Sequence, residues 1–464
     1  MSALAHLEQS LSTERSVLLA YSGGLDSSVL LHQLVLLRQQ RPELTLRALH
    51  IHHGLSPLAD SWVAHCVQQC ARWQVPLEVV KVNVDAREGG TEAAARNARY
   101  QALQRHLLPG ETLLTAQHRD DQCETLLLAL KRGSGPAGLA AMPQAHRLGA
   151  NRHLRPLLGF GRQQLEAWAE RYRLSWIEDE SNQDPRYDRN FLRLQVLPLL
   201  NERWPHFSAA AARSAALCGE QEQLLDELLA ASLDELIAVD GSLHFLPMMT
   251  MSAVRRAALL RRWIARQNGA MPSREALERI WQEVVCSRED AEPCLRLGSA
   301  EVRRYRDRLW WLTSAEPVRE CQLHWSAPWH PLRLPGQLGV LLANPDADCH
   351  GCCLRPPLLS EAVTVRFQAR GTFHIVGRAG SRPLKKLWQE AGVPPWQRER
   401  IPLIFYDERL IAAVGVFVTR EGAAASADGG WHICWQRENK ESHVEKGYDD
   451  GRAADTQPVS IGCG

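Results

Sequence analysis

Short apolar runs alternate with amphipathic stretches from Ser16 to Lys131, and this alternation limits the possible folds more than any other feature of the sequence. The pattern predicts strands at Ser16–Tyr21, Leu44–Ile51, Leu77–Val84 and Thr112–Ala116, and helices at Leu25–Arg38, Asp60–Trp73, Thr91–Leu108 and Asp120–Lys131. Repeated strand–helix units of this length join strands that run in the same direction, which predicts an α/β domain with a parallel sheet. Ligands then bind outside the carboxyl ends of the strands.

The length of the chain, 464 residues, exceeds what one hydrophobic core usually supports, so several domains are expected. We predict a catalytic domain at 1–205, a helical linker at 206–240, a small helical domain at 241–320, a linker rich in Pro, Gly and Cys at 321–357, and an α/β domain at 358–437. The tail at 438–464 is polar and poor in large apolar side chains, so it is predicted to be disordered.

The composition is that of a cytoplasmic protein without a membrane segment. No apolar run reaches the roughly 18 residues of a membrane helix, and the first residues lack the basic and apolar parts of a signal peptide. The 12 cysteines are scattered, unlike the dense framework of a small secreted domain. A formal net charge of +1 gives no general electrostatic argument for binding nucleic acid.

A loop rich in glycine and serine lies between the first predicted strand and its helix, and it reads Ser22-Gly23-Gly24-Leu25-Asp26-Ser27-Ser28. Paired glycines allow a tight turn and close approach of a phosphate, while the helix N-terminus offers free amides to an anion. Asp26 would repel phosphate unless a cation lies between them, which indicates Mg²⁺ or a cationic substrate group. An ordinary turn before a helix is the structural alternative. No Gly-Lys pair occurs, which excludes a Walker motif.

Two acidic residues follow the fourth predicted strand. Asp121 and Glu124 are three residues apart and therefore share one face of the first turn of a helix. Two carboxylates there could hold an ammonium group or a metal ion. Acids are also favoured in that turn by the helix dipole alone, so a purely structural role is the alternative.

Two other groups raise the question of a metal site. His52, His53 and His118 lack the spacing of a known metal-binding motif. The cluster Cys349–Cys353 lacks the second cysteine pair that a zinc or iron–sulfur site needs, and we interpret it as structural or incidental.

The sequence resembles the tRNA(Ile)-lysidine synthetase family from about Val17 to Trp435. The blocks that carry the resemblance are SGGLDSS, HIHHGL, TEAAARNARY, TAQHRDDQCETLLLALKRGSGPAGL, WIEDESNQDPRYDRNFLR and RPLKKLWQEAGVPPWQRERIPLIFYDERLIAAVGVFV, in the family's order. The resemblance implies an α/β, N-terminal parallel-sheet PP-loop domain, similar to adenine nucleotide alpha hydrolases, followed by two smaller C-terminal domains. The chain departs from many members at His52, where Asn is common, and at Gln117, where His is common.

The resemblance also implies a ligase that forms a carbon–nitrogen bond. Members use ATP to adenylate the C2 carbonyl oxygen of the wobble cytidine of tRNA(Ile) with a CAU anticodon. The ε-amine of free L-lysine then displaces AMP, which gives lysidine and changes the codon that is read from AUG to AUA. By motif, ATP would be bound by Ser22, Gly23, Gly24, Leu25, Asp26 and Ser27, and lysine by Asp121 and Glu124; Asp26 would handle Mg²⁺ or the lysine amine, and Arg99 and Arg189 would contact phosphate or substrate.

Two basic regions are candidates for contact with tRNA, given that arginine and lysine neutralise backbone phosphates. The residues are Arg255, Arg256, Arg261, Arg262 and Arg266 in the first region, and Arg382, Lys385 and Lys386 in the second. Solvated helix faces would give the same pattern. We expect no stable protein partner beyond a possible homodimer.

Three other functions remain as alternatives. The first is a PP-loop tRNA thiotransferase that acts on cytidine, which would want paired cysteines near the site, whereas Cys123 stands alone there. The second is a small-molecule ligase of the same superfamily, which would not need two basic C-terminal regions. The third is a non-catalytic RNA-binding protein.

Overall fold

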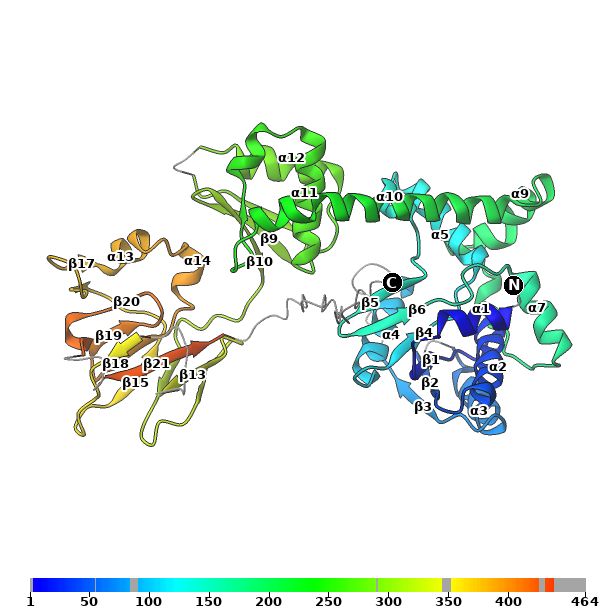
Figure 1. Cartoon of the computed structure of the whole chain (residues 1–464), viewed down its shortest axis with the longest axis horizontal. Coiled ribbons are helices and arrows are strands. Elements are labelled where there is room, and N and C mark those ends of the chain that lie inside the picture. The colour runs from blue at the N-terminus through cyan, green and yellow to red at the C-terminus, as the bar shows by residue number, and fades with distance from the viewer. Residues whose placement is uncertain are drawn as a thin grey trace, which may run out of the picture. The chain divides into compact units, whose positions relative to one another are not determined.

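The structure is a computed structural model that describes residues 3–54, 56–83, 91–288, 291–343, 352–424 and 430–437 (Figure 1). The chain divides into two compact units, Met1–Leu228 and Leu229–Gly464. The tail at 438–464, predicted to be disordered, lies outside the described residues. Within the described ranges, no helix has both the length and the apolar character needed to cross a bilayer.

The first unit is built on a six-stranded sheet in the order β3-β2-β1-β4-β6-β5. The strands are β1 (Ser16–Ala20), β2 (Thr45–His52), β3 (Leu77–Lys81), β4 (Thr112–Leu114), β5 (Ala145–Leu148) and β6 (Asn151–Leu154). All neighbours pair in parallel except β5, which is antiparallel to β6 at the edge. The predicted parallel sheet is confirmed, and the β5–β6 hairpin is an addition. The direction of winding reverses between β1 and β4, which places a binding crevice at their carboxyl ends.

Helices cover both faces of this sheet (Figure 1). On one face lie α1 (Ala3–Ser10), α2 (Leu25–Gln40), α3 (Ala59–Arg72) and α7 (Arg162–Arg171), and on the other lies α4 (Thr91–His106). Val17 and Leu19 of β1 belong to the core beneath the first group, whereas Leu18 packs with Leu103 of α4. Since successive side chains of a strand point to opposite faces, the two cores lie on opposite sides of the sheet.

The segment after β4 carries the rest of the first unit's helices. They are α5 (Arg119–Lys131), α6 (Pro136–Leu139), a 3₁₀ turn (Glu180–Gln183), α8 (Asp188–Phe191), a π-helical turn (Leu192–Val196), α9 (Leu197–Arg203) and α10 (Phe207–Leu236). Pro198 explains the π-helical turn, because proline has no N–H for an α-helical bond to Leu194 and its ring crowds that carbonyl. The boundary between the two units falls inside α10, in the stretch expected to be a helical linker.

The second unit begins with a small domain in which helices are followed by strands. A sheet in the order β7-β10-β9-β8 packs with α11 and α12 around the fully buried Trp263. The elements are β7 (Leu243–His244), a 3₁₀ turn (Leu246–Thr250), α11 (Ala253–Arg266), α12 (Arg274–Arg279), a π-helical turn (Ile280–Val285), β8 (Cys294–Leu297), β9 (Ala300–Tyr305) and β10 (Arg308–Thr313).

The last part of the second unit contains two sheets around a shared core and a separate two-stranded sheet of β16 and β17. One has the order β11-β15-β18-β19-β20 and the other β12-β13-β21-β14. The elements are β11 (Gln322–His324), β12 (Leu332–Arg333), β13 (Val340–Ala343), β14 (Cys352–Leu354), β15 (Val363–Arg366), β16 (Thr372–Phe373), β17 (Arg382–Pro383), α13 (Leu384–Glu390), α14 (Pro395–Arg398), β18 (Leu403–Tyr406), β19 (Arg409–Ala413), β20 (Phe417–Val418), a 3₁₀ turn (Arg420–Gly422) and β21 (Trp431–Gln436).

The structure corrects the linker that was expected at 321–357. In the described part of this stretch, β11 pairs with β15 and β13 pairs with β21, so these residues belong to the folded sheets. Leu341 and Leu354 are fully buried in the shared core. The strands are two to four residues long, too short to give a clear alternating pattern in the sequence.

Candidate active site

The loop between β1 and α2 is held open by a glycine in a left-handed conformation. Gly23 has φ +83°, and a Cβ at this position would lie 2.6 Å from Cδ1 of Ile177 and 2.8 Å from Sγ of Cys66. The Gly23 carbonyl accepts a hydrogen bond of 2.9 Å from the Ile177 N–H. Only glycine fits both the backbone conformation and this close approach. The shape of the loop therefore requires glycine at this position.

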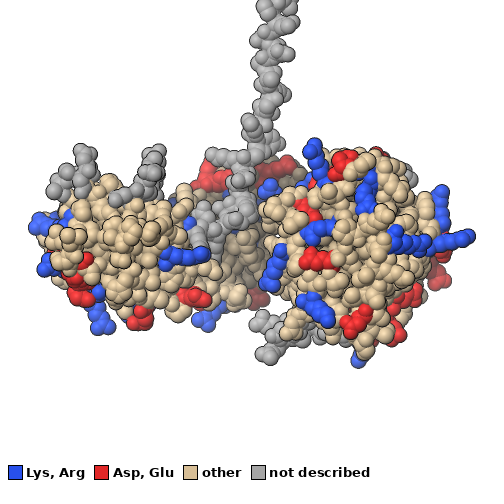
Figure 2. All heavy atoms as spheres, turned by 90° about the horizontal axis from the view of Figure 1, so that it is seen from below, with Lys and Arg blue, Asp and Glu red and all other residues tan. Residues whose placement is uncertain are grey.

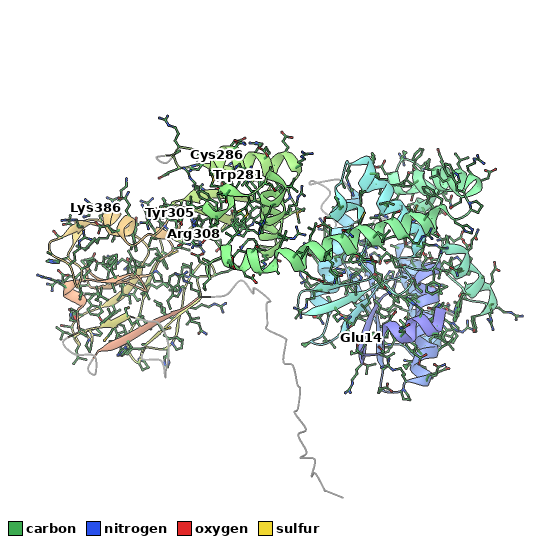
Figure 3. All side chains as sticks on the ribbon, turned by 45° about the horizontal axis from the view of Figure 1, so that its top comes forward. Glu14, Trp281, Cys286, Tyr305, Arg308 and Lys386 are labelled. Atoms are coloured by element: carbon green, nitrogen blue, oxygen red, sulfur yellow. The ribbon has the colours of Figure 1, made fainter. Side chains whose placement is uncertain are left out.

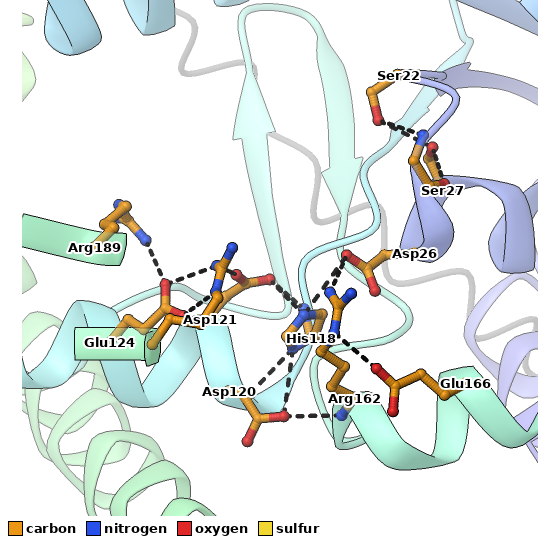
Figure 4. A network of polar contacts seen from close by, with 12 residues as sticks. Ser22, Asp26, Ser27, His118, Asp120, Asp121, Glu124, Arg162, Glu166 and Arg189 are labelled. Carbon is orange, nitrogen blue, oxygen red and sulfur yellow. Dashed lines mark hydrogen bonds and ion pairs between the residues drawn. The ribbon is translucent and has the colours of Figure 1, made fainter. Parts of the chain in front are cut away.

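Serine side chains line the same loop. The hydroxyls of Ser22 and Ser27 lie 3.0 Å apart, and Ser27 also donates to the Gly24 carbonyl at 3.0 Å (Figure 4). Gly24 precedes the first residue of α2, and no described side chain caps this helix end. The first amides of α2 are therefore available to an anion, and the helix dipole favours negative charge there. This arrangement suits the phosphates of a nucleotide.

Asp26 lies in the first turn of α2 and faces two cationic or proton-donating groups. Its Oδ2 is 3.7 Å from Nε2 of His118 and 3.7 Å from Nη1 of Arg162 (Figure 4). Its Oδ1 is buried without a hydrogen-bond partner among the described residues. Burial raises the pKa of this carboxyl, and His118 and Arg162 oppose the increase. An unsatisfied buried carboxylate oxygen beside a phosphate loop is a suitable ligand for a hard cation.

His118 connects Asp26 to the acids of α5. This fully buried residue precedes α5, and its Nδ1 accepts a hydrogen bond of 3.2 Å from the Asp120 N–H. In the neutral imidazole the proton must therefore lie on Nε2, which is 3.5 Å from Oδ2 of Asp121 as well as close to Asp26. His118 is held in place by its contacts with Asp26 and Asp121 and by its role as the N-cap of α5.

The two predicted acids of α5 face the same group, which is the guanidinium of Arg193. Nε of Arg193 donates to Oε1 of Glu124 at 2.8 Å, and Nη2 donates to Oε2 of Glu124 at 3.0 Å and to Oδ1 of Asp121 at 3.1 Å. Glu124 is 0% exposed, so its charge depends on these partners. The structure thus brings Asp26, Asp121 and Glu124 into one cluster, linked through His118 and Arg193.

The pKa values in this cluster follow from burial and from the paired charges. Burial raises the pKa of Glu124, a change that Arg193 opposes and Asp121 reinforces. Burial by itself would lower the pKa of Arg193, but the Glu124 and Asp121 carboxylates raise it overall. Both Glu124 and Asp26 therefore hold a proton more readily than an ordinary carboxylic acid.

The two arginines predicted from the sequence lie in different surroundings. Nη1 of Arg189 is 3.5 Å from Oε2 of Glu124, and its Nη2 donates to the Thr125 hydroxyl at 3.4 Å, so Arg189 joins the acidic cluster. Arg99 is exposed on α4 and acts electrostatically on His53. Burial, together with Arg99, lowers the pKa of His53 to about 4, so this imidazole is neutral at physiological pH.

Sequence reasoning missed Arg162 and Arg193 as site residues. Arg193 stands four residues after Arg189, a spacing that puts two helical side chains on one face and could have revealed it. Arg162 carries no such signal, because only the packing of α7 brings it to Asp26.

Metal-binding side chains do not gather into a group in the described part of the chain. No group of three or more His, Cys, Asp or Glu residues there could hold a metal ion. Nε2 of His52 lies 3.2 Å from Oδ1 of Asp60, and His52 forms no metal-binding group with His118 among the described residues. Magnesium needs only one or two protein carboxylates when substrate phosphates supply the other oxygens, so Asp26 alone satisfies that requirement.

Cysteines near the loop are buried thiols. Cys66 lies beneath Gly23, and burial raises its pKa to about 12. Cys123 on α5 is also fully buried, with a pKa raised to about 11 by burial. The thiol form is inert as a nucleophile or metal ligand. Of the cluster Cys349–Cys353, the described residues Cys352 and Cys353 lie in β14, and Cys349 lies outside the described residues.

The predicted tRNA-contact residues of α11 are largely engaged within their own domain. Arg256 stacks over the Trp281 ring at 4.2 Å, and Arg266 forms an ion pair of 2.5 Å with Asp234. The other three donate to neighbours: Arg255 to the Ser232 hydroxyl, Arg261 to the Pro272 carbonyl and Arg262 to the Ala258 carbonyl. Only Arg255 and Arg266 of the five are exposed.

The second basic group is more open to solvent. Lys385 and Lys386 are exposed on α13 and form no ion pair within the described residues. Lys386 is labelled on this helix in Figure 3. Arg382 is half-buried and donates to the carbonyl of Ser381 at 3.1 Å. On the face drawn in Figure 2, basic side chains are interspersed with acidic ones. The net charge of this face therefore does not identify which residues contact tRNA.

Comparison with known proteins identifies three matching domains along the chain. A PP-loop domain matches residues 2–200, a TilS substrate-binding domain residues 243–310, and a TilS substrate C-terminal domain residues 363–435. The tRNA(Ile)-lysidine synthase of Serratia proteamaculans is 60% identical over 433 residues, covering 93% of this chain and 98% of that protein. The enzyme of the same name from Salmonella paratyphi B is 59% identical over 429 residues, covering 92% of this chain and 99% of that protein.

Among solved structures, a U34-tRNA thiolase from Methanococcus maripaludis matches 46% of this chain and 76% of its own, with a TM-score of 0.41 and 16% identity. The close relatives named above extend over nearly the whole of their own length and include all three domains. With its phosphate loop, acidic cluster and full-length relatives, the chain belongs to the tRNA(Ile)-lysidine synthase family.

Proposed function

We propose that this chain uses ATP to activate the wobble cytidine of tRNA(Ile) with a CAU anticodon and then joins free L-lysine to C2 of that base. The product is lysidine, which makes the tRNA read AUA in place of AUG. The name shared by the full-length relatives supports the tRNA and the product. The observation that carries the proposal is the acidic cluster of Asp26, Asp121 and Glu124 beside an uncapped phosphate loop. We place the reaction in the cytoplasm, where ATP, lysine and tRNA are available.

The nucleotide would lie over the loop of Ser22–Ser27, with its phosphates toward the first amides of α2. The hydroxyls of Ser22 and Ser27 are within reach of phosphate oxygens from this position. Asp26 would hold Mg²⁺ through the buried Oδ1 that lacks another partner. When bound, Mg²⁺ neutralises charge on the phosphates and favours departure of diphosphate.

Arg162 extends the cationic side of the loop. Its Nη1 is 3.7 Å from Asp26, its Nε bonds to Glu166 at 3.0 Å, and about two fifths of its side chain is exposed, at 41%. A guanidinium at this distance can contact a phosphate oxygen without leaving α7. We assign Arg162 a role in holding the nucleotide, alongside Arg189 and Arg99.

The first chemical step forms a bond between the cytidine O2 and the α-phosphorus of ATP and breaks the bond from that phosphorus to the diphosphate. The amides of the loop stabilise charge on the α-phosphate during this transfer. In the second step the lysine ε-nitrogen bonds to C2, and the C2–O bond breaks so that AMP departs with the oxygen. The amine loses its protons as it attacks, so a base must lie beside it.

Glu124 is the base that suits this second step. Its pKa is raised by burial, so it accepts a proton from an ammonium group more readily than an exposed carboxylate would. Asp121 remains to hold the substrate through the 17% of its side chain that is exposed. This division of roles resolves the conflict between binding an ammonium group and attacking with a neutral amine.

The thiotransferase alternative is not favoured, because sulfur transfer needs a reactive thiolate. Cys66 and Cys123, the described cysteines nearest the loop and the acids, have pKa values raised to about 12 and about 11 by burial. A buried thiol of this kind neither attacks a persulfide nor binds a cluster.

The decisive experiment supplies the purified chain with ATP, Mg²⁺, radiolabelled lysine and separate transcripts of tRNA(Ile) with CAU and tRNA(Met) with the same anticodon. We expect label in the isoleucine tRNA only, with one diphosphate and one AMP released per lysine. Incorporation of sulfur, or lysine-independent labelling, would contradict the proposal. Omitting Mg²⁺ tests whether the reaction requires the metal.

A further inference from the structure

The lysine subsite proposed above already holds a cation that belongs to the protein. Arg193 makes three hydrogen bonds to Glu124 and Asp121, with lengths of 2.8, 3.0 and 3.1 Å. These two carboxylates are the groups that would bind the ammonium group of lysine. A guanidinium and an ammonium group satisfy the same acceptors, so the two cations compete for one place.

Charge balance makes simultaneous occupancy unfavourable. Asp121 and Glu124 carry two negative charges, and Arg189 and Arg193 carry two positive charges against them. A lysine ammonium group added to this set would leave one positive charge in excess next to the fully buried Glu124. Uncompensated charge in a buried site costs free energy, because few water dipoles are there to screen it.

The backbone under Arg193 differs from that under Arg189. Arg189 lies in α8, whereas Arg193 lies in the π-helical turn Leu192–Val196, which Pro198 imposes on the chain. A π-helical turn is a wide, uncommon segment within a helix and is often found at functional sites. The backbone of this turn can therefore rearrange and move Arg193 while Arg189, in α8, stays in place. The side chain of Arg193 is also 30% exposed, so it has a path toward solvent.

We propose that Arg193 occupies the amine subsite in the free enzyme and is displaced from Asp121 and Glu124 by the ε-ammonium group of lysine. Arg193 is then a positioning residue: its hydrogen bonds keep the two carboxylates oriented until the substrate arrives. Its departure leaves Glu124 facing the incoming amine as the proton acceptor. The inference rests on the proposed function and specifies how its lysine subsite is kept ready.

The test compares the lysine KM and kcat of the wild type with those of Arg193→Met, Arg193→Lys and Arg189→Met. Arg193→Met removes the competing cation but keeps an unbranched side chain. We expect its lysine KM to fall at least about threefold, because lysine no longer has to displace a side chain from Asp121 and Glu124 before it binds. The kcat should fall, and the ATP KM should be unchanged. Lysine should also raise the melting temperature of Arg193→Met by more than that of the wild type.

Arg189→Met is the matched control, because it removes a positive charge from the same cluster without removing the proposed competitor. Its lysine KM should fall by less than that of Arg193→Met, because the lost charge changes the balance but frees none of the acceptors that Arg193 occupies. An equal fall in both variants would mean that general electrostatics governs lysine affinity, and this would overturn the displacement. A rise of the lysine KM in Arg193→Met would overturn it as well, because Arg193 would then form part of the lysine site.

Arg193→Ala gives a second, independent measurement. Ethylguanidinium should inhibit this variant competitively with lysine and leave the wild type, which carries its own guanidinium, unaffected. Equal inhibition of both proteins would contradict the inference. If Arg193→Met or Arg193→Ala does not fold, Arg193→Lys keeps a cation there, and its lysine KM should stay within about twofold of the wild type. A wild-type chain that transfers no lysine to any tRNA would instead refute the proposed function itself.

Discussion

Asp120 on α5 accepts a hydrogen bond of 2.8 Å from the backbone N–H of Arg162, the first residue of α7. This contact joins two helices that are separated by the whole β5–β6 hairpin in the sequence. The adjacent backbone bond from Arg119 N–H to the Phe160 carbonyl, also 2.8 Å, fixes the same junction. Together they hold the start of α7 beside α2, which is why the Arg162 side chain reaches Asp26.

Replacing Asp120 with alanine should therefore affect both stability and nucleotide binding. The variant loses the carboxylate that caps α7, which we expect to lower the free energy of unfolding by about 1 kcal/mol. The ATP KM should rise, because Arg162 is no longer held against Asp26. Glu166→Ala is the control: it removes only an i,i+4 ion pair of Arg162 and should cost at most about 0.5 kcal/mol. An Asp120→Ala variant with an unchanged ATP KM would contradict this coupling.

Gly23→Ala should disrupt the phosphate loop. The added Cβ would lie 2.6 Å from Ile177 and 2.8 Å from Cys66, in a backbone conformation with φ +83° that alanine avoids. We expect a loss of stability of about 1–3 kcal/mol and weak ATP binding, measured by calorimetric titration. Gly24→Ala is the matched control, since its Cβ would find its nearest atom at 3.6 Å. Similar ATP affinities for the two variants would show that the shape of the loop is not what binds the nucleotide.

Asp26→Asn should abolish adenylation while leaving the fold intact. The amide keeps the shape of the side chain but removes the charge that would hold Mg²⁺ through the buried Oδ1. We expect diphosphate release in the presence of tRNA to fall by at least about 100-fold, on the order seen when a main charge-stabilising group is lost. Asp60→Asn, which changes an exposed acid that contacts His52, should leave release near the wild-type rate. Normal turnover by Asp26→Asn would contradict the proposal that Asp26 holds Mg²⁺.

The pair Lys385 and Lys386 should contribute to the affinity for tRNA. Both lysines are exposed on α13 without an ion pair in the described part of the chain, so their charges are available to phosphates. The double alanine variant should bind tRNA more weakly, and the slope of log affinity against log salt should decrease by about 1 to 2. Arg279→Gln, which removes a charge already paired with Glu283 at 2.7 Å, is the control. A salt slope that does not change would place these lysines outside the interface.

His153 should make the first unit sensitive to acid. It is fully buried on β6, and burial, with Arg155 nearby, lowers its pKa from 6.5 to about 3. The unfolded chain therefore binds a proton between these two values that the folded chain does not. The stability contributed by neutral His153 is complete above about pH 6.5 and declines toward pH 3, at about 1.4 kcal/mol per pH unit.

The measurement for His153 is hydrogen exchange of the β1 and β4 amides at pH 7 and pH 5.5, corrected for the intrinsic exchange rate. The opening free energy of the wild type should decrease between these pH values, and His153→Gln should show a smaller decrease. His206→Gln, which changes an exposed histidine of the same unit, should retain the full decrease. Identical pH dependence in the wild type and His153→Gln would exclude this residue as the cause.

Local patterns in the sequence were sufficient for the parallel sheet and for the phosphate loop. The strand at Ser16–Ala20, the loop from Ser22 and the helix from Leu25 are contiguous, so their order alone brings the loop to the carboxyl end of the first strand. The pairing of Asp121 with Glu124 was predictable for the same reason, because helical spacing sets which side chains share a face. Short strands such as β11 and β14 were missed, because two to four residues give no measurable period.

Tertiary structure alone decided which cations meet those acids. Arg162 approaches Asp26 only because α7 packs against α2, and Arg193 reaches Asp121 and Glu124 only because a π-helical turn directs it there. These contacts join residues 69 to 136 positions apart, from the Arg193–Glu124 pair to the Arg162–Asp26 pair, and no local period encodes them. The sequence by itself determined the elements and the residues they carry, since propensity and spacing act over a few residues. The partners of the buried charges depended on packing, because only the folded core brings distant segments within hydrogen-bond reach.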